Sequence, residues 1–266
     1  DVVSIEVLKD ASSTAIYGSR GANGVILINT KSGKLGEASV SFKSLTGFNS
    51  QASKNILKPL NAAQYTELFL EGYINKGDTP AKAQQRFDAT FKQLIDPSTG
   101  KPTDTNWLDA ITRTGVTQSY DLSARGGSDK VKYFMSGSYM DQESYIIGYG
   151  FKRFSARTNF EYKASDFLTI SNNISASDIT SSTSFSSGSF ENPFKNTLEL
   201  SPLIPIYDEQ GRYNGEHINY FPLGGTNPVG SLSGDDLWQT KQIRIIDNFA
   251  MTASLLKNLS FRSVQN

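Results

Sequence analysis

The chain has 266 residues, which is enough to bury one large core or two ordinary ones. Its 26 basic residues balance 26 acidic ones, so no global field favours nucleic acid or anionic lipid, and we do not expect nucleic-acid binding. The absence of cysteine excludes disulfide bonds and thiolate metal sites within the chain.

Composition and hydropathy narrow the class of protein further. Abundant Tyr and Phe, with frequent Ser, Thr, Asn and Gly, are typical of a β protein with long strands from outside the cytoplasm. No stretch reaches the roughly 18 to 20 continuous apolar residues of a membrane-spanning helix, which leaves a barrel as the only membrane-spanning option. There is no initiator Met and no signal peptide, so we expect position 1 to lie inside a longer protein.

The first 34 residues predict a strand, a single helical turn, a glycine corner and a second strand. Asp10 or Ser12 would cap the turn. Gly18, Gly21 and Gly24 recur at every third position, which suits a backbone that turns sharply and accepts positive φ. Their spacing matches neither G-x-x-x-x-G-K-[ST] nor G-x-G-x-x-G, and no long helix follows, so we discount a phosphate-binding loop.

As a run, residues 5–26, IEVLKDASSTAIYGSRGANGVI, resemble the end of the plug domain of SusC/RagA-type TonB-dependent outer-membrane transporters. Asn29 departs from the family pattern, which usually has Thr at that position. The resemblance implies a structural or gating role for a plug signature that comprises Lys9, Asp10, Tyr17, Gly18, Arg20, Gly21, Asn23 and Gly24.

A strand and a helical segment follow. Residues 37–48 alternate apolar and polar side chains, which predicts a strand with one apolar face. A helix capped by Asn61 would then place Tyr65, Leu68, Phe69 and Tyr73 on one face. A second helix is predicted to begin at Thr79-Pro80 and to run to about Ile95, with its apolar side chains facing inward. These inward side chains are Phe87, Phe91 and Leu94.

From residue 117 the alternation returns and predicts further strands at 117–125, 130–142, 153–162, 167–177, 240–254 and 259 to the end, about seven in all. Five charged residues share the polar faces of these strands and would line a lumen or contact the plug. The same residues fit equally the solvated charges of a β-sandwich. They are Asp121, Arg125, Arg153, Arg157 and Glu161.

The connections between the predicted strands are sorted by length. Tight turns at 126–129, 163–166 and 256–258 fall on one side of the sheet, whereas long loops at about 49–116 and 179–239 fall on the other, as in an outer-membrane barrel. Strands of about ten to thirteen residues also suit a tilted membrane strand.

Aromatic residues on the predicted strand 153–162 suit the same architecture. Phe154 and Tyr162 would stand about 20 Å apart along the membrane normal, which suits anchors at two interfaces. Aromatic side chains that merely pack a sandwich are the alternative.

The resemblance continues through Tyr120-Asp-Leu-Ser-Ala-Arg-Gly-Gly, Phe151-Lys-Arg-Phe-Ser-Ala-Arg-Thr-Asn and Pro202-Leu-Ile-Pro-Ile-Tyr-Asp-Glu-Gln-Gly-Arg-Tyr. We therefore predict a mainly β fold, a partial transmembrane antiparallel β-barrel preceded by the C-terminal part of a small α+β plug domain. The predicted domains are residues 1–35 for the plug part and 36–266 for the N-terminal part of the barrel.

The resemblance implies TonB-dependent active import of a large nutrient, an oligosaccharide or a peptide, across the outer membrane of a Gram-negative bacterium. Its implied partners are outer-membrane lipid, a SusD-like surface lipoprotein and the TonB complex, which would be contacted through a segment absent from this chain. Neither a cofactor nor an enzymatic activity is implied. The alternative is a secreted β-sandwich that binds glycan, and a hydrolase is less favoured because no paired-carboxylate or triad spacing stands out.

Other candidate site residues have simple structural explanations. His217 is the only histidine, so it cannot form a histidine cluster for zinc. The run Asp208-Glu-Gln-Gly lacks the spacing of a calcium loop and predicts a hairpin turn with Gly211 at its tight position. Trp107, Trp238 and Tyr220 could stack on a sugar ring or serve as packing anchors. No catalytic or metal-binding residue is predicted, and the substrate-binding residues remain unassigned.

Overall fold

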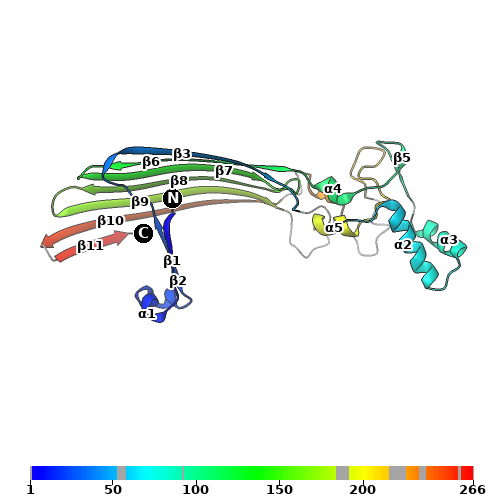
Figure 1. The fold of residues 1–266 in the computed structure, drawn as a ribbon, viewed down its shortest axis with the longest axis horizontal. Coiled ribbons are helices and arrows are strands. Elements are labelled where there is room, and N and C mark those ends of the chain that lie inside the picture. The colour runs from blue at the N-terminus through cyan, green and yellow to red at the C-terminus, as the bar shows by residue number, and fades with distance from the viewer. Residues whose placement is uncertain are drawn as a thin grey trace.

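The computed structural model describes residues 2–52, 58–91, 93–183, 192–215, 226–233, 238–256 and 259–265. It consists of a small N-terminal unit, a long curved sheet and a group of helices beyond one end of that sheet (Figure 1). In chain order, the elements are β1 (Val2–Leu8), α1 (Ala11–Thr14), the 3-10 helix η1 (Ala15–Gly21), β2 (Val25–Thr30), β3 (Gly36–Asn49), α2 (Ala62–Asn75), α3 (Pro80–Thr90), β4 (Ile95–Asp96), β5 (Lys101–Pro102), α4 (Trp107–Ile111), β6 (Gly115–Gly127), β7 (Val131–Glu143), β8 (Gly150–Lys163), β9 (Leu168–Thr183), α5 (Pro193–Glu199), α7 (Pro228–Ser231), β10 (Trp238–Leu256) and β11 (Leu259–Gln265).

The main sheet has seven strands in the order β11-β10-β9-β8-β7-β6-β3, and every neighbouring pair is antiparallel. Apart from β3, which precedes the helical insertion, neighbours in the sheet are also neighbours in the chain, as in an up-and-down barrel. Within the described residues, β3 and β11 have no partner on their outer edges, so the sheet is an unclosed part of a barrel. The predicted fold class is confirmed.

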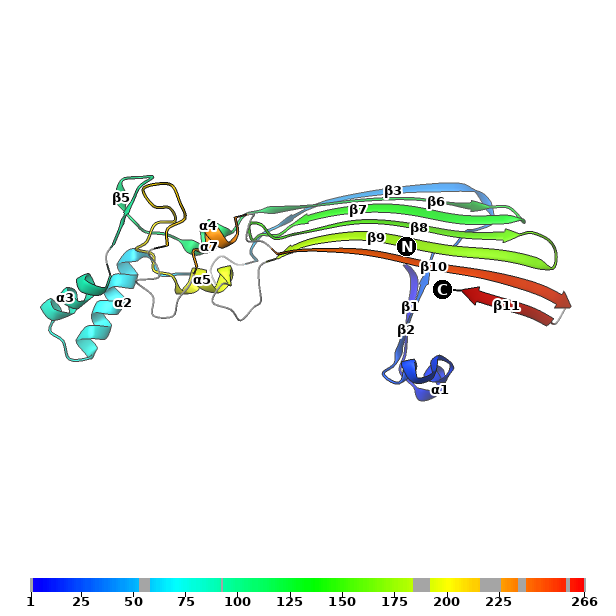
Figure 2. The ribbon, with the colours of Figure 1, turned by 180° about the vertical axis from the view of Figure 1, so that it is seen from behind.

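Connections of different length lie at opposite ends of the sheet (Figures 1 and 2). Residues 128–130 and 164–167 form short turns at one end, whereas residues 50–114, 144–149 and 184–237 connect strands at the other. Of the predicted turn at 256–258, Leu256 is the last residue of β10, and residues 257–258 lie outside the described residues. Strands β9 and β10 are longer than predicted, because Thr183 still pairs with Trp238.

The helices beyond the loop end begin at the predicted caps. Asn61 accepts a hydrogen bond from the Gln64 N–H, and the Gln64 side chain completes a capping box. The Thr79 hydroxyl accepts from the Lys82 N–H at the start of α3, and Pro80 follows at the first helical position.

Two predictions about these helices are wrong. Helix α3 ends at Thr90 and not near Ile95, because Phe91 is extended and the Leu94 N–H donates to the Leu203 carbonyl of a distant segment. On α2, Leu68 is 55% exposed, and Leu70 packs beside Tyr65, Phe69 and Tyr73 in its place.

The hydrophobic cores lie among these outer segments. One cluster joins α2 and α3 to Leu203, a second joins Trp107 to Leu200 and Ile204, and a third joins Ile111 to Ile146 and Leu232. Segments from three different strand connections therefore fold together beyond the sheet. None of the helices in the described part of the chain is long and apolar enough to cross a membrane.

Candidate functional site

The two faces of the main sheet differ in polarity. Residues paired across an antiparallel ladder share a face, so the register assigns every side chain in the regularly paired strands to one side. One row across six strands is Lys43, Asp121, Ser138, Ser155, Ser177 and Arg244. The adjacent row on the same face is Ser41, Ser123, Ser136, Arg157, Ser175 and Ile246. We call this side the polar face.

All five charged residues that the sequence assigned to a lumen or plug contact lie on the polar face. Asp121 and Arg157 belong to the two rows above, and Arg125 pairs with Phe134, which in turn pairs with Asn159. The other two residues of this set are Arg153 and Glu161. They lie four positions before and after Arg157 on β8, and therefore on the same face.

The opposite side, the apolar face, is uncovered. It carries large apolar side chains that are 39% to 70% exposed. Examples from six strands are Val40, Phe42, Leu122, Met135, Phe154, Ile174 and Ile245. Among the described residues no second sheet packs against this face, although a sandwich would require one. The polarity of the sheet is thus the reverse of that in a soluble domain with a buried apolar core.

Polar pairs also lie on the apolar face, namely Lys152 with Asp141, Lys241 with Asp178 and Asn172 with Asp247. The Asn172 amide donates to the Asp247 carboxylate over 2.8 Å, between Phe160 on one side and Phe249 on the other. The hydrogen bond satisfies part of a carboxylate that would otherwise face apolar surroundings alone.

The N-terminal unit is attached to the polar face. The Asn159 amide donates to the Lys31 carbonyl over 2.6 Å, and both Asn159 and Phe134 are buried. Gly33 lies so close to β7 that a Cβ there would stand 2.4 Å from the Tyr133 nitrogen. The segment after β2 is therefore fixed against the sheet wall, and the unit itself stands off the same side of the sheet (Figures 1 and 2).

The glycine corner of this unit has two kinds of glycine. Gly18 and Gly24 have φ of 59° and 92°, so positive φ requires glycine at both positions. Gly21 has no positive φ; a Cβ there would stand 2.8 Å from the Thr14 carbonyl oxygen, so close packing requires it. Asp10 occupies the cap position, but its side chain makes no capping hydrogen bond, and its carbonyl accepts from the Ser13 hydroxyl.

The other side chains of the plug signature make no polar contact that would point to a catalytic or binding role. Lys9, Tyr17, Arg20 and Asn23 are exposed and form no hydrogen bond or ion pair with another residue in the described part of the chain. Nor do the described ranges contain a cluster of three His, Asp or Glu residues that could hold a metal ion. The corner positions backbone and presents no nucleophile or base.

Two cavities lie on the polar face at the level of the serine rows. One, of about 190 Å³, is lined by Arg157, Arg244 and serines of β7, β8 and β9. The other, of about 170 Å³, is lined by Lys31, Lys43 and Asp121 together with serines of β3, β6 and β7. Small hydroxyl side chains thus leave space beside the sheet wall.

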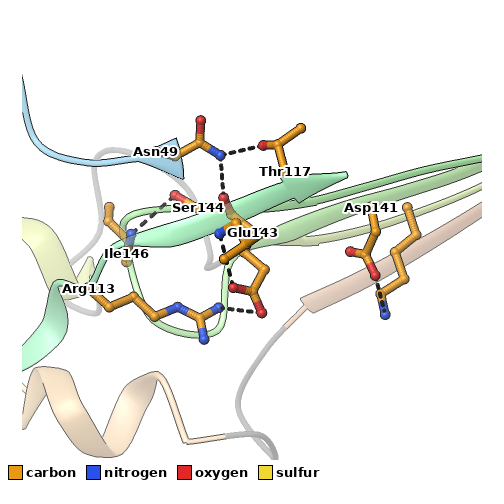
Figure 3. A network of polar contacts seen from close by, with 9 residues as sticks. Asn49, Arg113, Thr117, Asp141, Glu143, Ser144 and Ile146 are labelled. Atoms are coloured by element: carbon orange, nitrogen blue, oxygen red, sulfur yellow. Dashed lines mark hydrogen bonds and ion pairs between the residues drawn. The ribbon is translucent and has the colours of Figure 1, made fainter. Parts of the chain in front are cut away.

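A polar network closes the loop end of the sheet (Figure 3). The Asn49 amide donates to the Thr117 hydroxyl and to the Glu143 carbonyl, both over 2.7 Å. The Glu143 carboxylate accepts from the Val116 N–H and lies 3.6 Å from the Arg113 guanidinium. These contacts tie the ends of β3, β6 and β7 together where the long connections leave the sheet.

The remaining candidate residues from the sequence lie in different environments. Trp107 is a packing anchor, because it is 2% exposed and its indole N–H donates to the Ser201 carbonyl. Trp238 is 54% exposed at the start of β10. His217 and Tyr220 lie outside the described residues.

The predicted hairpin turn at Asp208 is confirmed. The Asp208 carboxylate accepts from the Gln210 and Arg212 N–H groups and from the Arg212 guanidinium, and Gly211 has φ of 75°. Desolvation of Asp208 acts to raise its pKa, but the hydrogen bonds and charge of Arg212, with the Gln210 N–H, lower the pKa further than desolvation raises it.

Comparison with known proteins gives a consistent set of relatives, although no protein-family model matches the chain. The chain is 28% identical to TonB-dependent receptor P3 of Formosa agariphila over 99% of its length, and 33% identical to TonB-dependent receptor P26 of that organism over 88%. It is 35% identical to TonB-dependent receptor SusC of Bacteroides thetaiotaomicron over 60% of its length. The chain spans 24%, 22% and 14% of these three proteins.

The chain is also similar to solved structures of the RagAB transporter. The structure of the RagAB peptide transporter has a TM-score of 0.73 and 26% identity, with 98% of this chain and 31% of that chain covered. The RagAB peptide importer in the 'open-open' state has a TM-score of 0.73 at 24% identity over 99% of this chain, which supports the fold alone. The similarity thus extends over the whole described sheet and its N-terminal unit.

Proposed function

The chain corresponds to part of a SusC/RagA-type TonB-dependent transporter, and from this premise we propose that it serves energy-coupled import of a large nutrient across the outer membrane of a Gram-negative bacterium. In this proposal the apolar face contacts lipid and the polar face lines the lumen. The protein carries out no chemistry on its substrate.

One observation carries the proposal: the N-terminal unit is docked on the polar face, through Asn159 and Gly33, while the apolar face is left open. A lumen that holds a plug needs a polar wall, because the wall contacts water and protein, whereas the outside of the barrel must be apolar. A soluble sandwich would bury the apolar face instead.

Within this proposal, residues 1–35 are the C-terminal part of the plug and residues 36–266 the N-terminal part of the barrel. The plug signature acts as a rigid corner of the gate, because its glycines permit turns and close packing that no other residue allows. Asp121, Arg125, Arg153, Arg157 and Glu161 line the lumen.

The names of the TonB-dependent relatives support TonB as a partner, and the sequence resemblance implies a SusD-like lipoprotein. TonB would act through a segment of the transporter outside this chain, and a SusD-like lipoprotein would cover the outward loops. RagAB, one of the similar structures, is a peptide transporter, which supports a peptide substrate for that relative. For this protein the proposed substrate is an oligosaccharide or a peptide.

The test uses the complete transporter expressed in a Gram-negative host. We expect heat-modifiable electrophoretic migration, fractionation with outer membranes and nutrient uptake that is lost on deletion of the tonB gene. Recovery in the soluble periplasmic or secreted fraction would contradict the proposal and favour the secreted glycan-binding β-sandwich. If the protein fractionates with outer membranes but uptake persists without TonB, the assignment as a membrane barrel would stand and the proposed energy coupling would be wrong.

A further inference from the structure

The polar face carries an excess of positive charge, although the whole chain has a formal net charge of zero. In the regularly paired part of the sheet, its basic residues are Lys43, Arg125, Lys132, Arg153, Arg157, Lys163, Arg244 and Arg262. Its acidic residues there are Asp121 and Glu161. The polar face is therefore strongly basic, even though the basic and acidic residues of the whole chain are equal in number.

The acidic residues do not neutralise the arginines. Glu161 is paired with Lys132 over 2.8 Å. Arg153, Arg157 and Arg244 form no ion pair with any residue that the structure describes. Arg153 and Arg244 are exposed and Arg157 is half-buried, so these guanidinium groups are free to pair with an anion from solvent, from a ligand or from another part of the protein.

Arg157 and Arg244 converge on one cavity. They lie on either side of β9, where Arg157 faces Ser175 and Arg244 faces Ser177 across the ladder. Both arginines line the cavity of about 190 Å³. The serine residues of its wall are Ser136, Ser138, Ser155, Ser175 and Ser177.

The chemistry of this cavity suits an anionic oxygen group. A guanidinium group presents N–H donors in a planar fork that binds carboxylate, phosphate or sulfate through paired hydrogen bonds. Serine hydroxyls supply further donors without filling the space. Two guanidinium groups around one cavity therefore favour an anion over a neutral or cationic group of the same size.

The described part of the N-terminal unit does not supply the missing negative charge. It contacts the wall at Asn159, which is nearer the tight-turn end than Arg157, and it brings the basic Lys31 to the adjacent cavity. The neighbouring part of the unit thus adds positive charge to the same wall.

We propose that Arg157 and Arg244 form an anion-selective step on the import path and that the imported oligomer carries carboxylate or sulfate groups. This inference rests on the proposed function, because only an imported substrate must pass along the lumen wall. The oligomer would exchange its anionic groups between Arg153, near the loop end, and the cavity at Arg157 and Arg244.

The experiment measures the electrostatic potential at the cavity in the complete transporter, within outer-membrane vesicles. Ser155→Cys introduces a thiol into the wall of the cavity, on the same strand as Arg157 and two residues from it, in a segment that has no cysteine of its own. The thiol is treated with anionic sulfonatoethyl methanethiosulfonate or cationic trimethylammonioethyl methanethiosulfonate. Peptide mass spectrometry then measures the rate at which each of the two reagents modifies the introduced cysteine.

We expect the ratio of anionic to cationic rates to fall roughly tenfold when Arg157→Gln and Arg244→Gln are added, because charged walls concentrate counter-ions by that order. Lys241→Gln is the matched control. It removes one positive charge from the same strand as Arg244 but from the opposite face, where Lys241 is paired with Asp178. The ratio should not change in this variant.

Two outcomes would overturn the inference. An unchanged ratio after removal of both arginines would mean that they do not attract anions. Failure of both reagents to react, with normal reaction at Leu45→Cys nearer the loop end, would mean that the plug fills the cavity. TonB-dependent uptake is measured separately, so a tenfold effect without such uptake would contradict the proposed function and leave the anion-attracting cavity in place.

Discussion

Asn159 joins two parts of the molecule that are 128 positions apart in the chain. Its side chain is buried and donates to a backbone carbonyl, so removing the amide leaves the partly buried Lys31 carbonyl without this partner. Asn173 pairs with Asn159 on the next strand and faces the same side, but it is exposed and has no comparable bond within the described ranges. The two asparagines form a natural pair of test and control.

Asn159→Leu should release the segment around Lys31 from the sheet wall. The expected cost is about 1–3 kcal/mol of local stability, since a partly buried acceptor loses its hydrogen bond. Hydrogen exchange of residues 31–35 in the complete transporter would measure it as faster exchange. Asn173→Leu should leave the exchange unchanged, and equal effects of both substitutions would contradict the assignment of Asn159 as the attachment point.

Asp208 gives a prediction of pH dependence outside the sheet. Because its pKa in the folded protein lies below the ordinary value, ionised Asp208 stabilises the hairpin above the ordinary carboxyl range, and this stabilisation is lost as pH falls through the lowered pKa. Asp208→Asn should therefore reduce exchange protection of residues 208–213 at pH 7. The difference from the unsubstituted protein should disappear at low pH; a difference that persists there would contradict this origin.

At the scale of single elements, each long strand has one polar and one apolar side. Ile245 on β10 is 70% exposed on the apolar face, and Gln242 on the same strand lies on the polar face. In the proposed orientation only the first contacts lipid. The same substitution at these two positions of β10 can therefore test which face of the sheet contacts lipid.

Ile245→Arg should destabilise the complete transporter in lipid vesicles by roughly 2–4 kcal/mol, because a cation is placed on the lipid-facing side near the middle of the apolar band. Gln242→Arg should change stability by no more than about 0.5 kcal/mol, because the residue faces the lumen. Urea unfolding monitored by tryptophan fluorescence would compare them. Equal costs at both positions would contradict the orientation of the sheet.

The sequence predicts the strands well because period-two alternation is a local property that survives into the structure. It misplaces the end of α3, since the Leu94 N–H pairs with Leu203, a partner more than a hundred positions away. The ends of β9 and β10 are missed for a similar reason: polar residues such as Thr183 continue the ladder only because Trp238 lies opposite.

The candidate site is predicted in part. The five charged residues share one face of the sheet, and that this face lines a lumen stays a prediction. Arg244 is missed, although the same alternation applied to residues 240–254 would have placed it on this face. The bond between Asn159 and Lys31 and the cavity at Arg157 have no local signal, because both depend on how distant segments meet.

At the scale of the whole molecule, the described sheet has two unpaired edges, β3 and β11, and an uncovered apolar face. Open strand edges in lipid leave backbone groups without hydrogen bonds, and in water they invite association. We expect residues 1–266 expressed alone to aggregate or to require detergent. A monomeric product that unfolds cooperatively in plain buffer, judged by light scattering and calorimetry, would contradict this view of the chain.

The most direct test compares two adjacent residues of β6 in the complete transporter, reconstituted in lipid vesicles. Leu122 lies on the apolar face and Ser123 on the polar face, so a fluorophore on Leu122→Cys should contact lipid and one on Ser123→Cys should not. Quenching by a bromolipid is predicted to be strong at position 122 and weak at position 123. Equal quenching at the two positions, or stronger quenching at 123, would contradict the assignment of the apolar face to lipid and the polar face to the lumen.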